Sequence, residues 1–250
     1  MEDNTNPVGF RQFEFELTNA LIAQLVRCLD DLESAPLTSK NVGLIPDGQG
    51  VYQLFLDGKL QYIGKTDSEA GLSVRLLKHS RKISGRPNLR GRVTFKAVQV
   101  LVFSAMELET MLIQHYKNVE GKVKWQHSGF GSNDPGRRRD RTDYKIDHFD
   151  VLYPIDIDEK GSFEFQSGAS IKDCLDQIKG QLPYIFRFGK SHKLEVIKLT
   201  QRVTASSVRD AIEQIVKLLP PGWQATRLPG YLILYEEFTE YVHGEKIAIS

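Results

Sequence analysis

The 250-residue chain has little cysteine and no long hydrophobic run. Its two cysteines, Cys28 and Cys174, have no CxxC partner, which excludes a disulfide framework and predicts a reduced, cytoplasmic protein. No stretch approaches the roughly 18–20 apolar residues that span a bilayer, so no membrane partner is expected. The N-terminal stretch MEDNTNPVGF is acidic and polar, unlike a signal peptide or an Arg-rich transit peptide.

The chain also has almost no net charge, because its 33 Lys and Arg residues are balanced by 32 Asp and Glu residues. This balance hides a segregation along the chain. Residues 57–141 hold 17 of the basic and 8 of the acidic residues, a net charge of +9, and the remainder carries −8. A basic segment between acidic ends favours a polyanionic partner, although a solvated basic face is the plainer alternative.

The pattern of apolar residues predicts an α/β (α+β) chain with a small, mainly antiparallel sheet flanked by helices. Residues 1–40 are expected to form an arm, with a strand around Phe13 and Phe15 and a helix capped by Thr18. Residues 41–158 form the central domain. Its predicted strands are 51–56, 59–64 and 95–103, and its predicted helices are 71–82 and 106–116.

Residues 159–250 are expected to form a second α+β unit without a catalytic constellation. Its predicted helices are a weak one over 175–182 and an amphipathic one capped by Ser206 or Ser207. Its predicted strands are 184–188, 194–199 and 231–235. A stabilising, dimerising or DNA-clamping role is left open for this unit.

The central domain opens on a hairpin with an unusual pair of triplets. Gly50-Val51-Tyr52 and Tyr62-Ile63-Gly64 flank the turn signal Asp57-Gly58, and Lys65 follows. Tyrosine is a good strand residue, so each triplet alone would indicate only a strand. Their pairing across one hairpin resembles the motif of GIY-YIG nucleases. Further along the chain come Arg75, His79 and Glu109, in the order of that family's catalytic residues.

The resemblance implies a role for each of these residues in phosphodiester hydrolysis. Tyr52 is the expected base, with Tyr62 and His79 positioning water or phosphate; a base requires a lowered tyrosine pKa, which nearby Lys65, Arg75 and a metal would provide. Arg75 suits the phosphate charge of the transition state. Glu109 suits Mg²⁺, which binds one or two carboxylates and keeps waters, and Glu107 is the alternative carboxylate.

This chemistry also predicts the register of the hairpin. A two-residue turn at Asp57-Gly58 would pair Tyr52 with Ile63 and place the tyrosines on opposite faces. A three-residue loop, Leu56-Asp57-Gly58, would pair Tyr52 with Tyr62 directly. Because both hydroxyls are needed at one site, the three-residue loop is predicted.

A later loop resembles one particular branch of this family. Trp125, the run GFG at 129–131, and Asn133 to Gly136 before an arginine run resemble type II restriction endonucleases that cut CCGCGG. The resemblance is densest over about residues 40–158. It implies a homodimer on double-stranded DNA, since a palindrome is matched by two-fold symmetry, and a cognate DNA methyltransferase as functional partner. One departure is Gln126, where the family has Asn in a catalytic position, so reduced activity is an alternative.

Two other functions stay open: a GIY-YIG nuclease of another defence or repair system, and a DNA-binding protein that has lost cleavage. In each case the basic and amide side chains of two loops are the candidate DNA contacts. Most are expected to contact phosphates rather than bases. They are Arg81, Lys82, Arg86, Asn88, Arg90, Arg92, Asn133, Arg137, Arg138, Arg139 and Arg141.

Overall fold

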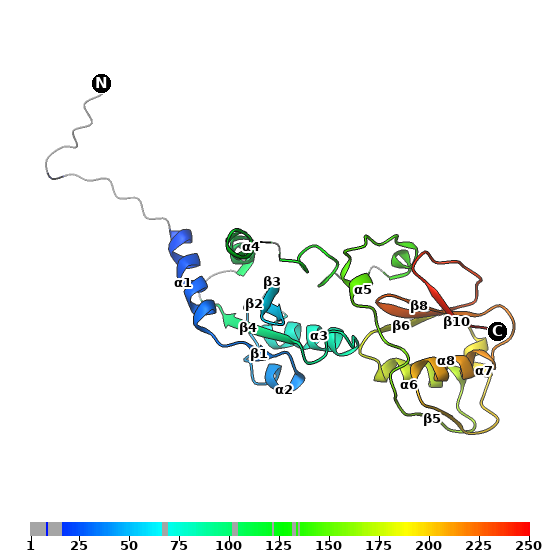
Figure 1. The fold of residues 1–250 in the computed structure, drawn as a ribbon. Coiled ribbons are helices and arrows are strands. Elements are labelled where there is room, and N and C mark those ends of the chain that lie inside the picture. The colour runs from blue at the N-terminus through cyan, green and yellow to red at the C-terminus, as the bar shows by residue number, and fades with distance from the viewer. Residues whose placement is uncertain are drawn as a thin grey trace.

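The computed structural model describes Gly9 and residues 17–66, 70–101, 105–121, 123–131, 134 and 136–250. The strand predicted around Phe13 and Phe15 lies outside these residues. Within them the chain forms two units, each built around a four-stranded sheet, joined along one side by the segment 123–152 (Figure 1). The predicted α+β class is therefore confirmed. None of the described helices is both long enough and apolar enough to cross a membrane.

The first unit has an antiparallel sheet in the order β1-β4-β2-β3. Its strands are β1 Ala35–Pro36, β2 Gly50–Leu56, β3 Lys59–Thr66 and β4 Val93–Gln99. Its helices are α1 Leu17–Asp31, α2 Ser39–Val42, α3 Leu72–Ser84 and α4 Ala105–Glu120. Helix α1 begins before Thr18, the predicted cap. Because β1 pairs with β4 and α1 packs against the sheet, this arm shares the core of the first unit.

The two faces of this sheet bury different helices. Side chains alternate along a strand, so Val51 and Tyr52 point to opposite faces. Val51 and Ile63 share a core with Leu29 of α1 and with α4. Tyr52 packs on the other side with Tyr62 of β3, with α3 and with three aromatic residues of the later segment: Trp125, Phe130 and Phe149. This second side is called the tyrosine face below.

The hairpin register differs from the prediction. Leu56 pairs with Lys59 across a two-residue turn, in which Asp57 and Gly58 both have positive φ, 49° and 77°. The predicted three-residue loop, with Tyr52 directly opposite Tyr62, is therefore wrong. After Phe55 pairs with Leu60, the pairing shifts so that Leu54 opposes Tyr62 and Tyr52 opposes Gly64. The extra residue in this bulge turns the following side chains of β3 to the opposite face of the sheet. Tyr52 and Tyr62 therefore lie on the same face, as expected.

The second unit has a mixed sheet in the order β10-β8-β9-β6, in which only β6 and β9 are parallel. Its strands are β6 Ile185–Phe188, β8 Gln224–Leu228, β9 Tyr231–Tyr235 and β10 Glu245–Ile249, beside a ribbon of β5 Phe163–Phe165 and β7 Val203–Ala205. Its helices are α6 Ile171–Gln181, α7 Lys193–Val196 and α8 Val208–Val216. Ser207 caps α8 by accepting from the backbone of Asp210.

One predicted strand of this unit is wrong. Residues 194–199 begin within helix α7, which buries Leu194. A six-residue run of mixed apolar and polar residues fits both periods, and here the short helix prevails.

The joining segment contains a 3₁₀ helix, η1 Gly136–Arg141, and the short helix α5 Phe149–Leu152. Phe149 packs in the core of the first unit, whereas Ile155 and Ile157 pack in the core of the second. Ile155 also donates its backbone N–H to Pro229 O at 2.8 Å. The change from one core to the other therefore falls between α5 and Ile155.

Candidate active site

Four side chains from three elements meet on the tyrosine face. Tyr52 comes from β2, Tyr62 from β3, and Arg75 and His79 from α3, where a spacing of four residues gives them one face. The Tyr52 hydroxyl lies 2.8 Å from His79 Nε2, and Arg75 Nε donates to the same hydroxyl oxygen at 3.4 Å. The two tyrosine rings lie 6.1 Å apart between centroids. These four predicted catalytic residues form one cluster.

Burial shifts the pKa values of Tyr52 and His79 in this cluster. Burial raises the pKa of Tyr52 well above its ordinary value, with Tyr62 adding to the effect. The prediction that neighbouring cations lower the pKa of Tyr52 is therefore wrong for the protein's own residues, because desolvation outweighs Arg75. Burial also lowers the pKa of His79 well below its ordinary value. Burial therefore favours the uncharged form of both groups, and the Tyr52 hydroxyl and His79 Nε2 share a hydrogen bond of 2.8 Å.

Glu109 stands at the rim of the cluster, in α4. Its side chain is 22% exposed, and Lys65 Nζ lies 3.9 Å from its Oε2 atom. Burial raises the pKa of Glu109, although Lys65 and Arg75 act against this. The same charge acts on both tyrosines, which places the carboxylate within electrostatic reach of their hydroxyls. The side chain of Glu107, the alternative carboxylate, lies outside the described part of the chain.

The donor set around Glu109 is sparse. Among the described residues no group of three or more His, Cys, Asp or Glu side chains could hold a metal ion. Mg²⁺ binds through one or two carboxylates and fills its other positions with water and phosphate oxygens. A single, partly exposed carboxylate beside tyrosine hydroxyls fits that ion, whereas it does not fit a structural zinc site, which takes four protein ligands.

Two glycines let the backbone approach the tyrosine hydroxyls. A Cβ atom at Gly64 would lie 2.3 Å from the Tyr52 hydroxyl, so the ring rests on the bare backbone of β3. Gly131 has a φ of 77°, and a Cβ there would lie 2.7 Å from the Tyr62 hydroxyl. The Gly131 carbonyl also accepts from Arg75 Nη2 at 3.3 Å. Both positions require glycine for the cluster to close.

Phe130 completes the packing of the cluster. Its ring stacks on His79 with centroids 4.7 Å apart and an angle of 18°, and it meets the edge of Tyr62 at 4.9 Å. Trp125 supports Phe130 from behind, with centroids 5.0 Å apart. Phe130 therefore fixes the imidazole plane, a role that the sequence prediction did not assign. The run GFG was the available signal, since two glycines around one aromatic allow a sharp approach.

Gln126, predicted as a catalytic amide, contacts the main chain. Its Oε1 atom accepts the backbone N–H of Ile63 at 3.2 Å, on the outer side of β3. Strand β3 is an edge strand, so this N–H has no partner in the sheet. The amide therefore covers an exposed edge, and no side chain of the cluster engages its oxygen.

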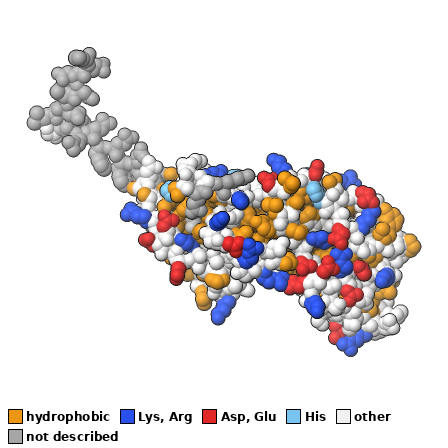
Figure 2. Space-filling view, in the orientation of Figure 1, with side chains coloured by type: hydrophobic (Ala, Val, Ile, Leu, Met, Phe, Trp, Pro, Cys, Tyr) orange, Lys and Arg blue, Asp and Glu red, His pale blue; other side chains and the backbone are white. Residues whose placement is uncertain are grey.

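The residues predicted to contact DNA fall into two groups: those that pair with a carboxylate of this chain, and those that are exposed. Several arginines are held by carboxylates from elsewhere in the chain, often from the acidic second unit. The pairs are Arg86 and Arg139 with Asp150, Arg90 with Glu159, Arg92 with Asp57, and Arg137 with Glu237. Arg81, Asn88, Arg138 and Arg141 are exposed, Lys82 is partly buried, and Asn133 lies outside the described residues. On the face drawn in Figure 2, basic and acidic side chains are correspondingly interspersed.

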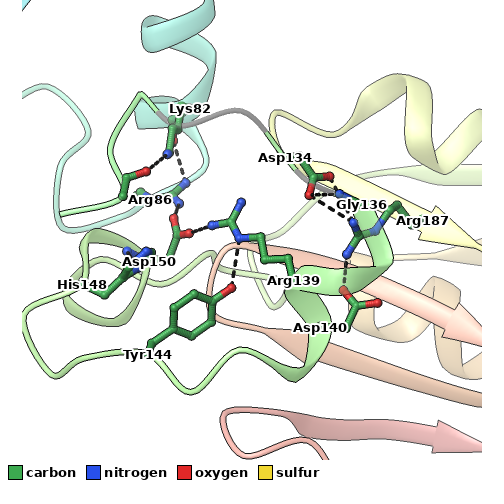
Figure 3. Close-up of polar contacts among 11 residues, drawn as sticks. Lys82, Arg86, Asp134, Gly136, Arg139, Asp140, Tyr144, His148, Asp150 and Arg187 are labelled. Atoms are coloured by element: carbon green, nitrogen blue, oxygen red, sulfur yellow. Dashed lines mark hydrogen bonds and ion pairs between the residues drawn. The ribbon is translucent and has the colours of Figure 1, made fainter. Parts of the chain in front are cut away.

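The most buried of these pairs joins the first unit to the 3₁₀ helix η1 (Figure 3). Asp150 is 1% exposed and accepts from Arg86 Nη2 at 2.5 Å and from Arg139 on its other oxygen. A Cβ at Gly230, in the turn between β8 and β9, would lie 2.7 Å from the Asp150 carboxylate. Nearby, Arg187 of β6 pairs with Asp134 and with Asp140. These contacts fix η1 between the two sheets.

No model of a known protein family matches the chain, and no curated protein does. Arg75 supplies a cation, Tyr52 a buried hydroxyl that is hydrogen-bonded to the imidazole of His79, and Glu109 a partly exposed carboxylate. Groups of these kinds can transfer protons and stabilise a developing negative charge.

Asp150 and Arg187 were not predicted as site residues. No sequence signal identified them, because neither belongs to a recognisable motif and the partners of each come from other parts of the chain.

Proposed function

We propose that the chain is a metal-dependent DNA endonuclease of the GIY-YIG type, and that it acts as a homodimeric type II restriction endonuclease on CCGCGG. One observation supports this above the others. Tyr52, Tyr62, Arg75 and His79, spread over 28 residues of sequence, converge in one cluster with the Tyr52 hydroxyl bonded to His79 at 2.8 Å. A hairpin core alone would require neither a buried histidine nor an arginine aimed at the tyrosine oxygen.

The cluster suggests how a water molecule would lose its proton. Tyr52 would accept the proton from water while passing its own proton to His79 Nε2, so the tyrosine would stay neutral and the imidazole would carry the positive charge. This relay replaces the lowered tyrosine pKa that the sequence suggested. Arg75 would stabilise the negative charge that gathers on the phosphate oxygens. When bound at Glu109, Mg²⁺ supplies further electrostatic stabilisation of that charge.

The remaining features of the proposal come from the resemblance. A palindromic site implies two subunits related by a two-fold axis, each cutting one strand. A restriction enzyme also implies a cognate methyltransferase and a cytoplasmic location. The exposed side chains Arg81, Asn88, Arg138 and Arg141 are the best placed to meet DNA, because none of the ion pairs among the described residues involves them.

A plasmid assay tests the function directly. Two supercoiled plasmids that differ only in one CCGCGG site are incubated with the protein, with Mg²⁺ or with EDTA, and separated on a gel. Linear product from the site-bearing plasmid alone, and only with Mg²⁺, is expected. Cutting of both plasmids would indicate a nuclease of another system. Gel retardation without cutting would indicate a DNA-binding protein and would contradict the proposal.

Replacing Gly64 with Ala is expected to lower the cleavage rate about 100-fold, because the new methyl group displaces the Tyr52 hydroxyl from His79. Single-turnover cleavage measures the rate, and circular dichroism checks that the variant is folded. Gly180→Ala is the matched control: Gly180 lies in α6 with no atom within 4 Å of an added Cβ. A wild-type rate in Gly64→Ala would refute the role of Tyr52.

A further inference from the structure

A cavity of about 580 Å³ lies where the two units meet. One wall is the exposed side of α3 and the turn after it, and η1 adds Arg139. The other wall belongs to the second unit, from Leu182, Pro183, Tyr184 and Ile185 and from Gly230 of the β8–β9 turn. Arg75 and His79 also line it, so the cavity is continuous with the catalytic cluster.

The charge around this cavity is strongly one-sided. Six of the residues that line it are permanent or usual cations: Arg75, Lys78, Arg81, Lys82, Arg86 and Arg139. The acidic residue among the lining residues, Asp134, is already paired with Arg187. Asp150 lies behind the wall and shares its two oxygens between Arg86 and Arg139. A partly enclosed space with such an excess of positive charge attracts anions.

Lys82 is a partly buried cation of this wall, and none of the ion pairs among the described residues involves it. Its Nζ atom reaches the Gly129 carbonyl at 3.5 Å and lies 4.9 Å from the centre of the Phe149 ring. Burial lowers the pKa of Lys82 to about 8, although Asp150 acts against this. Three neighbouring cations lower it further: Arg86, Arg139 and Lys78. Arg86 adds a buried Nε with no hydrogen-bond partner in the described structure. An anion in the cavity would relieve both groups.

The volume of the cavity and the apolar wall from the second unit indicate which class of ligand it could bind. Ligand cavities of roughly 300–1,000 Å³ take small organic molecules, so this one exceeds the needs of a bare inorganic ion. The cations of α3 and η1 would bind an oxyanion. The apolar and aromatic wall from residues 182–185 would cover a sugar or a base, as aromatic residues do in proteins that bind nucleic-acid strands.

We propose that this cavity binds the phosphate group of a nucleotide unit, with Lys82 as its central contact and the second unit as its far wall. The proposal rests on the proposed function in one respect: the nucleotide would belong to the DNA strand that enters the catalytic cluster. It also gives the second unit a specific role, since without residues 182–185 and Gly230 the cavity would be open on one side.

Binding is tested first without any cleavage. The full chain in EDTA is titrated with deoxycytidine monophosphate and, separately, with sodium sulfate at constant ionic strength, and backbone amide signals are followed by NMR. Saturable shifts of Gly131 and Gly230, from opposite walls, are expected. Absence of saturable shifts at both positions would overturn the proposal.

Substitutions of Lys82 test its role. Lys82→Met is expected to weaken sulfate binding about tenfold, whereas Lys82→Arg, which keeps the charge, should bind like the wild type. Lys40→Met, at an exposed position in α2, is the matched control and should bind normally. Equal weakening in Lys82→Arg and Lys82→Met would show a packing effect and would overturn the role of the charge.

A pH series separates Lys82 from the other groups around it. Sulfate keeps its charge between pH 7 and 9, while the charged fraction of Lys82 falls from about nine-tenths to about one-tenth. Arg86 and Arg139 stay charged over this range, Asp150 stays ionised, and His148, whose pKa burial lowers, stays neutral. Sulfate affinity should therefore fall about tenfold in the wild type. In Lys82→Arg it should stay level, and a parallel fall there would overturn the assignment.

A displacement experiment distinguishes a site for a DNA phosphate from a site for a free nucleotide. In EDTA, a short duplex that contains CCGCGG should displace deoxycytidine monophosphate from the cavity. If it binds without displacing the nucleotide, the cavity is a nucleotide site unrelated to the DNA strand, and the link to the proposed function is overturned. Because no cleavage is measured, loss of nuclease activity in the plasmid assay leaves these results interpretable.

Discussion

Replacing Glu109 with Gln should abolish Mg²⁺-dependent DNA cleavage, with a loss of rate of at least about 100-fold. The amide keeps the size of the side chain but removes the one carboxylate that, among the described side chains of the cluster, could hold a hard cation. Because Glu109 is partly exposed and its described ion-pair partner is Lys65 at 3.9 Å, the fold should survive the change. Single-turnover cleavage at saturating protein measures the rate, and gel retardation measures DNA affinity.

Glu164→Gln is the control for this substitution. Glu164 lies on β5 of the second unit and pairs with Arg202 at the surface, far along the chain from the cluster. It should cut DNA at the wild-type rate. Cleavage by Glu109→Gln at more than a tenth of that rate would refute the proposed metal position and would direct attention to Glu107.

Local patterns in the sequence were sufficient to predict most of the first unit. The turn signal Asp57-Gly58 located the hairpin, and apolar spacing located α3, α4 and α8 within a few residues. The predicted register of the hairpin was wrong because a bulge leaves no local signal in the sequence. The Asp57-Gly58 turn is the same with or without an extra residue in β3.

Strand β8 was missed for a different reason. Its inward positions include Gln224 and Thr226, which are 3% and 1% exposed and bond each other. A strand that buries polar side chains shows no alternation of apolar residues, so only the completed sheet reveals it.

The members of the candidate site were predicted better than their chemistry. Order along the chain identified Tyr52, Tyr62, Arg75 and His79 because each belongs to a recognisable element. The protonation of Tyr52 depends on burial, which sequence does not show, and the expected cations were outweighed by desolvation. The same limit affected the arginines. Charge counting showed a basic segment, but partners as distant in sequence as Arg137 and Glu237 neutralise part of it.

The last prediction concerns Asp150, the carboxylate that joins Arg86 of the first unit to Arg139 of η1. Arg86 is 2% exposed at its side chain, and among the described residues Asp150 is the one acid that contacts it. A buried ion pair contributes little net stability, because desolvation offsets the attraction. Removing one partner is far more costly, since the other charge remains buried without compensation. Here the loss would also leave Arg139 and Lys82 facing Arg86 with no intervening negative charge.

Asp150→Asn is therefore expected to lower the free energy of unfolding by about 3–5 kcal/mol, a large part of the roughly 5–15 kcal/mol of a typical domain. Urea unfolding followed by tryptophan fluorescence measures it. Asp158→Asn, which removes an exposed partner of Arg209, should change the free energy by less than about 1 kcal/mol.

The pH dependence gives an independent check on Asp150. Its three cationic neighbours hold the pKa of this carboxyl below its ordinary value, despite burial. The pair therefore stabilises the fold above about pH 4, and this contribution is lost as the pH falls further and the folded protein takes up the proton. The wild type should lose more stability than Asp150→Asn between pH 5 and 3. Equal losses, or a loss at pH 7 no larger than that of Asp158→Asn, would show that the buried ion pairs of Asp150 do not stabilise the fold.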